Sequence, residues 1–134
     1  MGTLIDTSVL VAVERGQLDA GSVIGAAAAL DDRVAMAAIT ASELLQGVEA
    51  ARGVRRIEAE RAFKTWLAVL PVIPFDLDVA RVHAILTHQL GRKGTPIGAH
   101  DLIIAATAVS GGYRVATRDR RSFNRVEGLD IEYW

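Results

Sequence analysis

The sequence predicts an α/β fold in which a parallel sheet is covered by helices on both faces. Short apolar segments alternate along the chain with longer segments of helical periodicity, an order typical of parallel strands joined by helices. One short segment, VAMAAI at residues 34–39, is apolar throughout, as expected for a strand buried on both sides. Residues 102–109 are apolar or small except for Thr107, which predicts a helix buried almost all round.

Local signals divide the chain into elements. Strands are expected at residues 3–6, 34–39, 71–75, 113–117 and 128–134, the last at an edge of the sheet. Helices are expected at residues 7–16, 19–30, 40–53, 54–70, 76–90 and 101–109. Thr7 or Ser8 can cap the first helix, and Gly16 ends it. The alanine-rich second helix is expected to end in a turn at residues 31–33.

Capping signals and amphipathic spacing mark the later helices. Thr40 and Glu43 have the spacing of a capping box, so a helix is expected to begin there. Residues 54–70 carry apolar side chains at helical spacing, with charged residues elsewhere on the surface. Asp76 opens the next helix, and residues 91–98 are expected to form a loop that leads to Asp101.

Length and composition limit the classes of protein. The 134 residues fit a single domain, residues 1–134, which is long enough to bury about two thirds of its unfolded surface. Cysteine is absent, which excludes disulfide frameworks, thiolate zinc sites and cysteine nucleophiles. The N-terminal segment has no basic leader and contains Asp6 and Glu14, so we expect a soluble cytoplasmic protein without a membrane span. A net charge of -1 argues against a uniformly basic nucleic-acid binder.

Four acidic residues are expected at one end of the predicted sheet. They are Asp6 at the end of the first strand, Glu43 and Asp101 in the first turns of two helices, and Asp119 just beyond the strand at 113–117. Right-handed crossovers would bring all four to the carboxyl ends of the strands, where such sheets bind ligands. Clustered carboxylates repel one another unless a cation neutralises them, and oxygen ligands favour Mg²⁺ or Mn²⁺ over zinc. Because such an ion activates water and stabilises charge on phosphate, phosphodiester hydrolysis is the predicted reaction class.

Each acid taken alone has an ordinary structural explanation. Glu43 can be the capping-box partner of Thr40, and Asp6 and Asp101 can cap helices, each contributing about 1 kcal/mol. Asp119 can be a solvated loop residue. A coincidence of four acids at corresponding ends of elements is much harder to explain in this way, so the sequence favours a metal site.

Three stretches occur in a characteristic order: LIDTSVLV at 4–11, IGAHDLIIAATA at 97–108, and VATRDRRSFNRVEGLDIE at 115–132, with Glu43 between the first two. Together they resemble the PIN-domain ribonucleases, in particular the VapC toxins of toxin–antitoxin modules, over nearly the whole chain. The resemblance implies a PIN-like three-layer α/β/α fold with a central, mainly parallel sheet. It also implies a Mg²⁺-dependent endoribonuclease toxin that cleaves tRNA or a structured rRNA loop.

The resemblance further implies roles for single residues and for partners. The acidic positions of the family fall on Asp6, Glu43, Asp101 and Asp119. Asp6 and Asp101 are expected to bind Mg²⁺ directly, Glu43 directly or through water, and Asp119 is expected to hold a second ion or orient the attacking water. Ser8 and Thr117 match polar positions that support the metal ligands. A homodimer is implied, as is a VapB-type antitoxin whose C-terminal segment blocks the acidic site.

Other residues near Asp119 and Asp101 have two interpretations each. The arginines around Asp119 are candidates for contact with RNA backbone, and a solvated loop is the equally weighted alternative: Arg114, Arg118, Arg120, Arg121 and Arg125. His100 can shuttle protons, although a partly exposed residue whose ring faces away from the site is favoured. Phe123 is expected in the core, and core or interface packing is favoured over base stacking for Trp66 and Trp134.

Competing functions differ in what they require. A catalytically weak PIN-like binding module that acts through its antitoxin complex is the alternative, and the four intact acids argue against it. A phosphatase of the haloacid-dehalogenase type needs a second aspartate two residues after Asp6, where this chain has Ser8. A receiver domain needs a lysine near the acids, and a dinucleotide site needs G-x-G-x-x-G after the first strand; the chain has neither.

Overall fold

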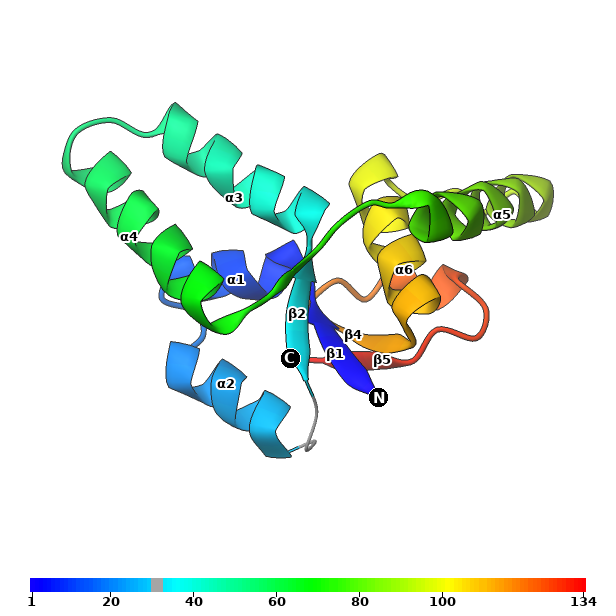
Figure 1. Ribbon diagram of the computed structural model, residues 1–134, viewed down its shortest axis with the longest axis horizontal. Coiled ribbons are helices and arrows are strands. Elements are labelled where there is room, and N and C mark those ends of the chain that lie inside the picture. Colours follow the sequence, from blue (N-terminus) through cyan, green and yellow to red (C-terminus); the bar gives the residue numbers. More distant parts are fainter. Residues whose placement is uncertain (30–32) are drawn as a thin grey trace.

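The computed structural model describes residues 1–29 and 33–134, in which strands and helices alternate as the sequence predicts (Figure 1). The strands are β1 (Gly2–Ile5), β2 (Val34–Ala37), β3 (Val72–Ile73), β4 (Tyr113–Thr117) and β5 (Ile131–Tyr133). The helices are α1 (Thr7–Glu14), α2 (Ala20–Ala29), α3 (Ala38–Ala50), α4 (Val54–Val69), α5 (Leu77–Lys93), α6 (Ala99–Gly111) and the short 3₁₀ helix η1 (Phe123–Arg125). Of the turn expected at residues 31–33, only Arg33 belongs to the described residues.

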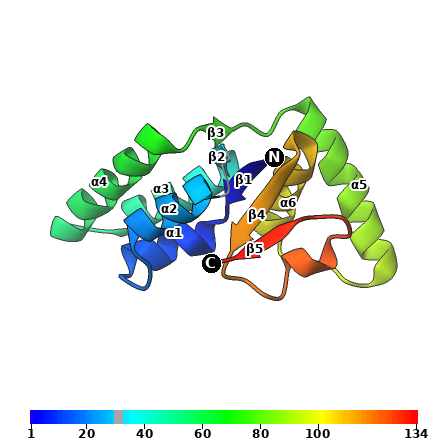
Figure 2. The same cartoon turned by 90° about the horizontal axis from the view of Figure 1, so that it is seen from below.

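The strands form one parallel sheet in the order β3-β2-β1-β4-β5. In Figure 2 the helices α1 to α4 lie on one side of the sheet and α5 and α6 on the other, which confirms the three-layer α/β/α arrangement. β1 lies at the centre, where Leu4 pairs with Ala35 of β2 and Val115 of β4. The predicted edge strand is confirmed in β5.

Side chains on the strands alternate between two cores, one on each face of the sheet. Leu4, Ala35 and Ala37 pack with α5 and α6, in a cluster that includes Ile104. Ile5 and Met36, the neighbours of these residues along the strands, pack on the opposite face with α1, α3 and α4. Burial on both faces explains why the strand segments are apolar throughout instead of alternating with polar residues.

The aromatic residues expected in the core are found there. Phe123 is fully buried in the cluster with α5 and α6. Trp66 is 4% exposed in the other cluster, against which the partly buried Trp134 also packs. Residues 104–108 of α6 are all buried, which confirms the predicted enclosure for the middle of this helix, whereas Val109 is 41% exposed.

The predicted start of α3 and the predicted cap of α1 are wrong. α3 begins at Ala38, two residues before Thr40, so Thr40 and Glu43 both lie inside the helix and do not form a capping box. Thr40 is instead fully buried, and its hydroxyl faces α1. Thr7 is already the first residue of α1, and the residue at the capping position is Asp6, whose side chain makes no capping hydrogen bond within the described residues.

The loop predicted at residues 91–98 is shorter than expected. α5 continues through Arg92 and Lys93. Their positive charges stabilise the last turn of the helix, because they interact favourably with the negative end of the helix dipole. Gly94 then ends the helix with φ of 67°, a left-handed conformation that glycine adopts without strain. No helix in the described part of the chain is long and apolar enough to cross a membrane.

Candidate acidic site at the carboxyl end of the sheet

Asp6 follows β1 directly and is the most buried of the four acids, with 3% of its surface exposed. Its backbone amide donates to the Ala116 carbonyl at 2.9 Å, which ties it to β4. Its Oδ2 accepts hydrogen bonds from Ser8 Oγ at 2.6 Å and Thr117 Oγ1 at 2.8 Å. Burial raises the pKa of Asp6, and these bonds, with those from the backbone amides of Ser8 and Thr7, oppose part of the rise. Ser8 and Thr117 therefore support the carboxylate, as expected.

Asp119 lies in the loop after β4 and is held by that loop. Its amide donates to Thr117 Oγ1 at 2.9 Å, and its Oδ1 accepts from the amides of Arg121 at 2.7 Å and Ser122 at 3.3 Å. Burial alone would raise the pKa of Asp119. The bonds from the Arg121 amide and from Ser122, together with the Arg121 charge, outweigh burial and hold the pKa below its ordinary value.

Asp101 occupies the first turn of α6, and the charges of the other three acids affect its pKa. Burial and then the charge of Asp6 raise its pKa, a hydrogen bond from Ser122 lowers it, and the charges of Asp119 and Glu43 raise it further. Such interactions are screened beyond about 10 Å at physiological salt, so the four acids lie in one region of the molecule. The residue at the capping position of α6 is Gly98, so a cap is not the role of Asp101.

Glu43 is held from two neighbouring helices. Thr7 Oγ1 of α1 donates to Glu43 Oε1 at 2.9 Å. The Nδ1 atom of His100, at the start of α6, lies 3.5 Å from Glu43 Oε2. The expectation that the His100 ring faces away from the site is therefore wrong, although the side chain is half exposed as expected.

The structure brings the four acids to one edge of the sheet, but their side chains do not converge on one point as the ligands of a bound metal ion do. Within residues 1–29 and 33–134, no three acidic or histidine side chains converge closely enough to form a ready-made ion site. The donor set nevertheless suits a hard divalent cation, because it consists of oxygen ligands. A cation would also offset the repulsion that, after burial, raises the pKa of Asp101.

The arginines near Asp119 have separate partners. The Arg118 guanidinium lies 3.4 Å from the Trp134 carbonyl, and that of Arg120 lies 4.4 Å from the centre of the Tyr133 ring. Arg125 donates to the Pro96 carbonyl at 2.8 Å. Arg114 is the second residue of β4, three residues or roughly 10 Å before Thr117, so the structure does not bring it to the acidic edge. Among the predicted RNA contacts, Arg121 interacts with an acid of the site: its amide donates to Asp119 Oδ1, and its charge helps to lower the pKa of Asp119.

Two hydroxyl residues at the site were not predicted. Thr7 contacts Glu43, and Ser122 hydrogen-bonds with both Asp101 and Asp119. Thr7 is adjacent to Asp6 in the sequence, and Ser122 follows Asp119 by three residues. Proximity to a predicted ligand was the available signal for both.

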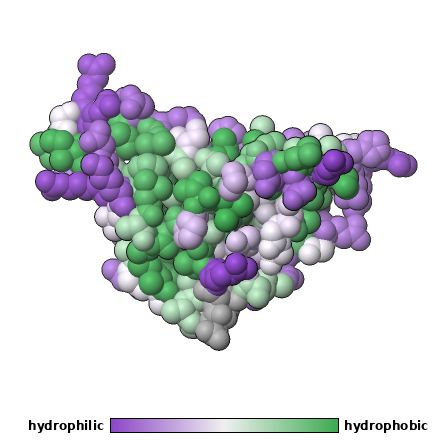
Figure 3. All heavy atoms as spheres, viewed as in Figure 1, coloured by the Kyte–Doolittle hydropathy of each residue, from purple (hydrophilic) through white to green (hydrophobic). Residues whose placement is uncertain are grey.

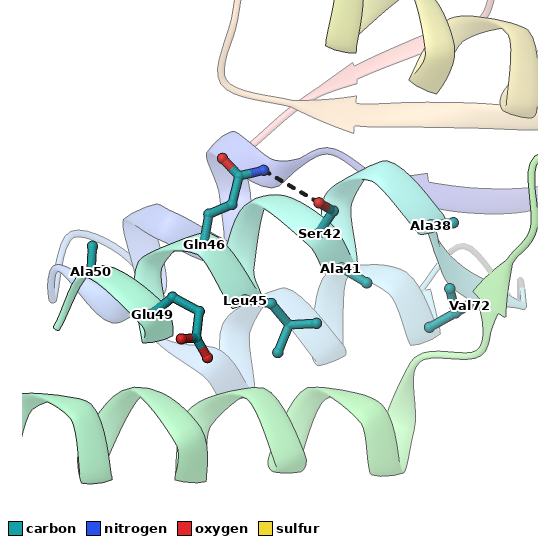
Figure 4. A pocket seen from close by; sticks show the side chains of 8 residues that line it. All are labelled: Ala38, Ala41, Ser42, Leu45, Gln46, Glu49, Ala50 and Val72. Atoms are coloured by element: carbon teal, nitrogen blue, oxygen red, sulfur yellow. Dashed lines mark hydrogen bonds between the residues drawn. The ribbon is translucent and has the colours of Figure 1, made fainter.

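Two surface hollows flank α3. The first is a shallow groove of about 700 Å³ along α3, lined by Ala38, Ala41, Ser42, Leu45, Gln46, Glu49 and Ala50 of α3 and by Val72 of β3, and it contains none of the four acids. Figure 4 shows that Leu45 and Glu49 point from α3 toward the α4 ribbon. The second hollow, of about 590 Å³, lies among α1, α3 and α4 and includes Glu43. Of the four acids, Glu43 lines this hollow, and Asp6, Asp101 and Asp119 do not.

The fold and the site together define a class of proteins: parallel α/β sheets with a carboxylate cluster beyond the ends of the central strands. The model of the PIN domain family matches residues 3–129 of this chain. The chain belongs to the PIN domain family.

Curated relatives support this assignment over most of their length. The chain is 37% identical over 134 residues to "VapC ribonuclease Y4jK" of Sinorhizobium fredii, covering 96% of this chain and 94% of the relative. It is 34% identical over 102 residues to the "tRNA(fMet)-specific endonuclease VapC" of Salmonella typhimurium, covering 76% of each. The resemblance to VapC-type PIN domains is thereby confirmed.

Solved structures show the same fold. The structure of DNA-bound VapBC from Salmonella typhimurium is similar with a TM-score of 0.88 at 26% identity, covering 100% of this chain and 98% of that chain. VapBC2 from Rickettsia felis, bound to a DNA fragment from its promoter, gives a TM-score of 0.89 at 24% identity, covering 100% and 99%. At 24% identity, the similarity to VapBC2 from Rickettsia felis shows a shared fold alone.

Proposed function

We propose that this protein is a VapC-type endoribonuclease, the toxin of a toxin–antitoxin module, and that it depends on Mg²⁺, with Mn²⁺ as a substitute. The observation that carries the proposal is that four carboxylates from different elements lie at one end of the sheet. They interact there, since the charges of Asp6, Asp119 and Glu43 add to the effect of burial in raising the pKa of Asp101. Membership in the PIN family and likeness to named VapC ribonucleases support the same reaction.

Asp6 and Asp101 would bind the ion directly, and Glu43 would bind it directly or through water. Asp119 would hold a second ion or orient the attacking water. When bound, the ion supplies activation of water and stabilisation of charge on the phosphate. Ser8 and Thr117 hold Asp6 in one orientation through their bonds to Oδ2. Asp119, with its lowered pKa, stays ionised but is a weak base, which favours orienting water over removing its proton.

We propose tRNA or a structured rRNA loop as the substrate. The likeness to a tRNA(fMet)-specific endonuclease supports a tRNA, and Arg121 beside Asp119 is the best-placed side chain for a phosphate contact. Mapping new 5′ ends in total cellular RNA after incubation with the protein identifies the target.

Cleavage tests the proposal. The wild-type protein should cut RNA at discrete positions with Mg²⁺ and not with EDTA. Asp101→Asn and Asp6→Asn should lose at least about 100-fold in rate, because a metal ion contributes several kcal/mol to such reactions. Asp78→Asn is the matched control, since Asp78 also lies in the first turn of a helix, α5, outside the site.

Equal RNA products from the wild type and Asp101→Asn would contradict the proposal. That outcome would favour a PIN-fold binding module that acts through its antitoxin complex.

We also propose a homodimer and a VapB-type antitoxin as protein partners. Solved structures similar over the whole chain are VapBC complexes, and the 700 Å³ groove along α3 offers an apolar surface for a partner segment. Figure 3 shows hydrophobic residues gathered across the middle of the face seen in Figure 1, with hydrophilic residues at the outer ends of α4 and α5. We assign the groove to the antitoxin.

A further inference from the structure

Among the contacts within residues 1–29 and 33–134, Glu43 is the only one of the four acids whose two carboxylate oxygens each face a side chain from a different helix. Oε1 accepts from Thr7 of α1 at 2.9 Å, and Oε2 lies 3.5 Å from Nδ1 of His100 in α6. The Thr7 contact has the shorter distance and the geometry of a hydrogen bond. The side chain of Glu43 is thus held between the helices that follow Asp6 and carry Asp101.

The placement of Thr7 serves this contact rather than its own helix. Thr7 is the first residue of α1, where a hydroxyl often pairs with a free backbone amide. Its Oγ1 instead lies 3.1 Å from Thr40 Oγ1 and 2.9 Å from Glu43 Oε1, both on α3. Thr40 is fully buried and precedes Glu43 by three residues, so both lie on the same face of α3.

An unrestrained glutamate has many rotamers, and fixing them costs up to about 2 kcal/mol of conformational entropy. Thr7 is branched at Cβ and 9% exposed, so its own side chain has little freedom. A stiff hydroxyl bonded to Oε1 limits the orientations of Glu43 before any ligand arrives.

We propose that Thr7 is a positioning residue that orients the Glu43 carboxylate for the divalent ion. The proposal rests on the proposed function for the identity of the ion, and it concerns a residue with no direct role in the chemistry. Outer residues that orient metal ligands typically change metal affinity or activity by 10- to 100-fold.

Three variants test the proposal through Mn²⁺ binding, measured by electron paramagnetic resonance in the absence of RNA, and through RNA cleavage. Thr7→Val keeps the branched shape and removes the hydroxyl; it should weaken Mn²⁺ binding about 10-fold and lower kcat while leaving KM for RNA unchanged. Thr7→Ser keeps the hydroxyl and should restore both. Thr107→Val is the matched control, because Thr107 is also buried, at 1% exposed against 9% for Thr7, and its hydroxyl bonds to the Ile103 carbonyl of its own helix.

A double variant separates positioning from simple support of the fold. If Thr7 acts through Glu43, Thr7→Val should change Mn²⁺ affinity little in a Glu43→Gln background. Equal losses in both backgrounds would overturn the proposal, as would wild-type Mn²⁺ affinity in folded Thr7→Val. If the wild type binds Mn²⁺ but cuts no RNA, a weaker Thr7→Val site would support the positioning role while the nuclease function fails. A wild type without Mn²⁺ binding would overturn both.

Discussion

Asp101 is, with Asp6, one of the two site acids whose pKa is raised. Its pKa is raised by burial, by the charge of Asp6 and, less strongly, by Asp119 and Glu43, against a hydrogen bond from Ser122. A carboxyl group with a raised folded-state pKa leaves the fold undisturbed while protonated and destabilises it once ionised. The loss of stability therefore begins as pH rises above the unfolded pKa, near 4, and is complete above the folded pKa.

In EDTA, Asp101→Asn should therefore unfold at a higher temperature than the wild type at pH 7. The difference should disappear below about pH 4, where Asp101 is protonated in both states. Thermal unfolding between pH 3 and pH 8 measures it, with Asp78→Asn as the control. Mg²⁺ should then raise the melting temperature of the wild type more than that of Asp101→Asn. A variant less stable than the wild type at pH 7 in EDTA would show that the charge of Asp101 does not strain the fold.

Predictability differed among side chains for physical reasons. Asp6 and Asp119 follow strands and Asp101 lies in the first turn of a helix, positions that the topology of a parallel sheet determines. Glu43 lies deeper in its helix than the sequence predicts, because α3 begins at Ala38. Thr7 and Ser122 were missed because a hydroxyl is compatible with caps, loops and solvent alike. Arginines are long and flexible, so their sequence position near Asp119 did not predict that Arg120 lies over Tyr133.

At the level of elements, the start of α5 is the clearest agreement between sequence and structure. Asp76 lies at the capping position, and its Oδ1 accepts from the Val79 amide at 3.0 Å. Asp76→Ala should therefore cost about 1 kcal/mol of unfolding free energy, or roughly 4 °C in Tm. Asp78→Ala in the same first turn, which removes no capping bond, is the comparison. RNA cleavage should be unchanged in Asp76→Ala well below its Tm. An equal loss of stability in Asp76→Ala and Asp78→Ala would show that the capping bond of Asp76 does not stabilise the helix.

The start of α3 could not be predicted in the same way. Thr40 and Glu43 have the capping-box spacing, but the helix begins at Ala38 and directs both side chains toward α1. Burial of Thr40 against Thr7 outweighs the local capping preference, a tertiary effect that short-range spacing does not encode. The same spacing that suggests a cap here places Glu43 one turn from Thr40 and within reach of the site.

For the whole molecule, the α/β class and the three layers followed from the alternation of apolar strands with helices. The strand order β3-β2-β1-β4-β5 did not, because strands of two to five residues carry little information about their neighbours. The groove along α3 also escaped prediction. It depends on how α3, α4 and β3 pack in space, and its apolar residues have the spacing of any amphipathic helix.

The groove permits a test of the partner at the same scale. Leu45 lines it and is 42% exposed, so Leu45→Glu should leave the fold intact. Loss of a buried leucine contact costs about 1.5–3 kcal/mol, so the variant should bind the proposed VapB-type antitoxin roughly 10- to 100-fold more weakly. Leu77→Glu, a change at an exposed leucine of α5 outside the groove, should bind normally.

Free Leu45→Glu should still cleave RNA, because the groove contains none of the four acids, but the antitoxin should inhibit it poorly. Normal inhibition of Leu45→Glu would place the antitoxin on another face of the molecule.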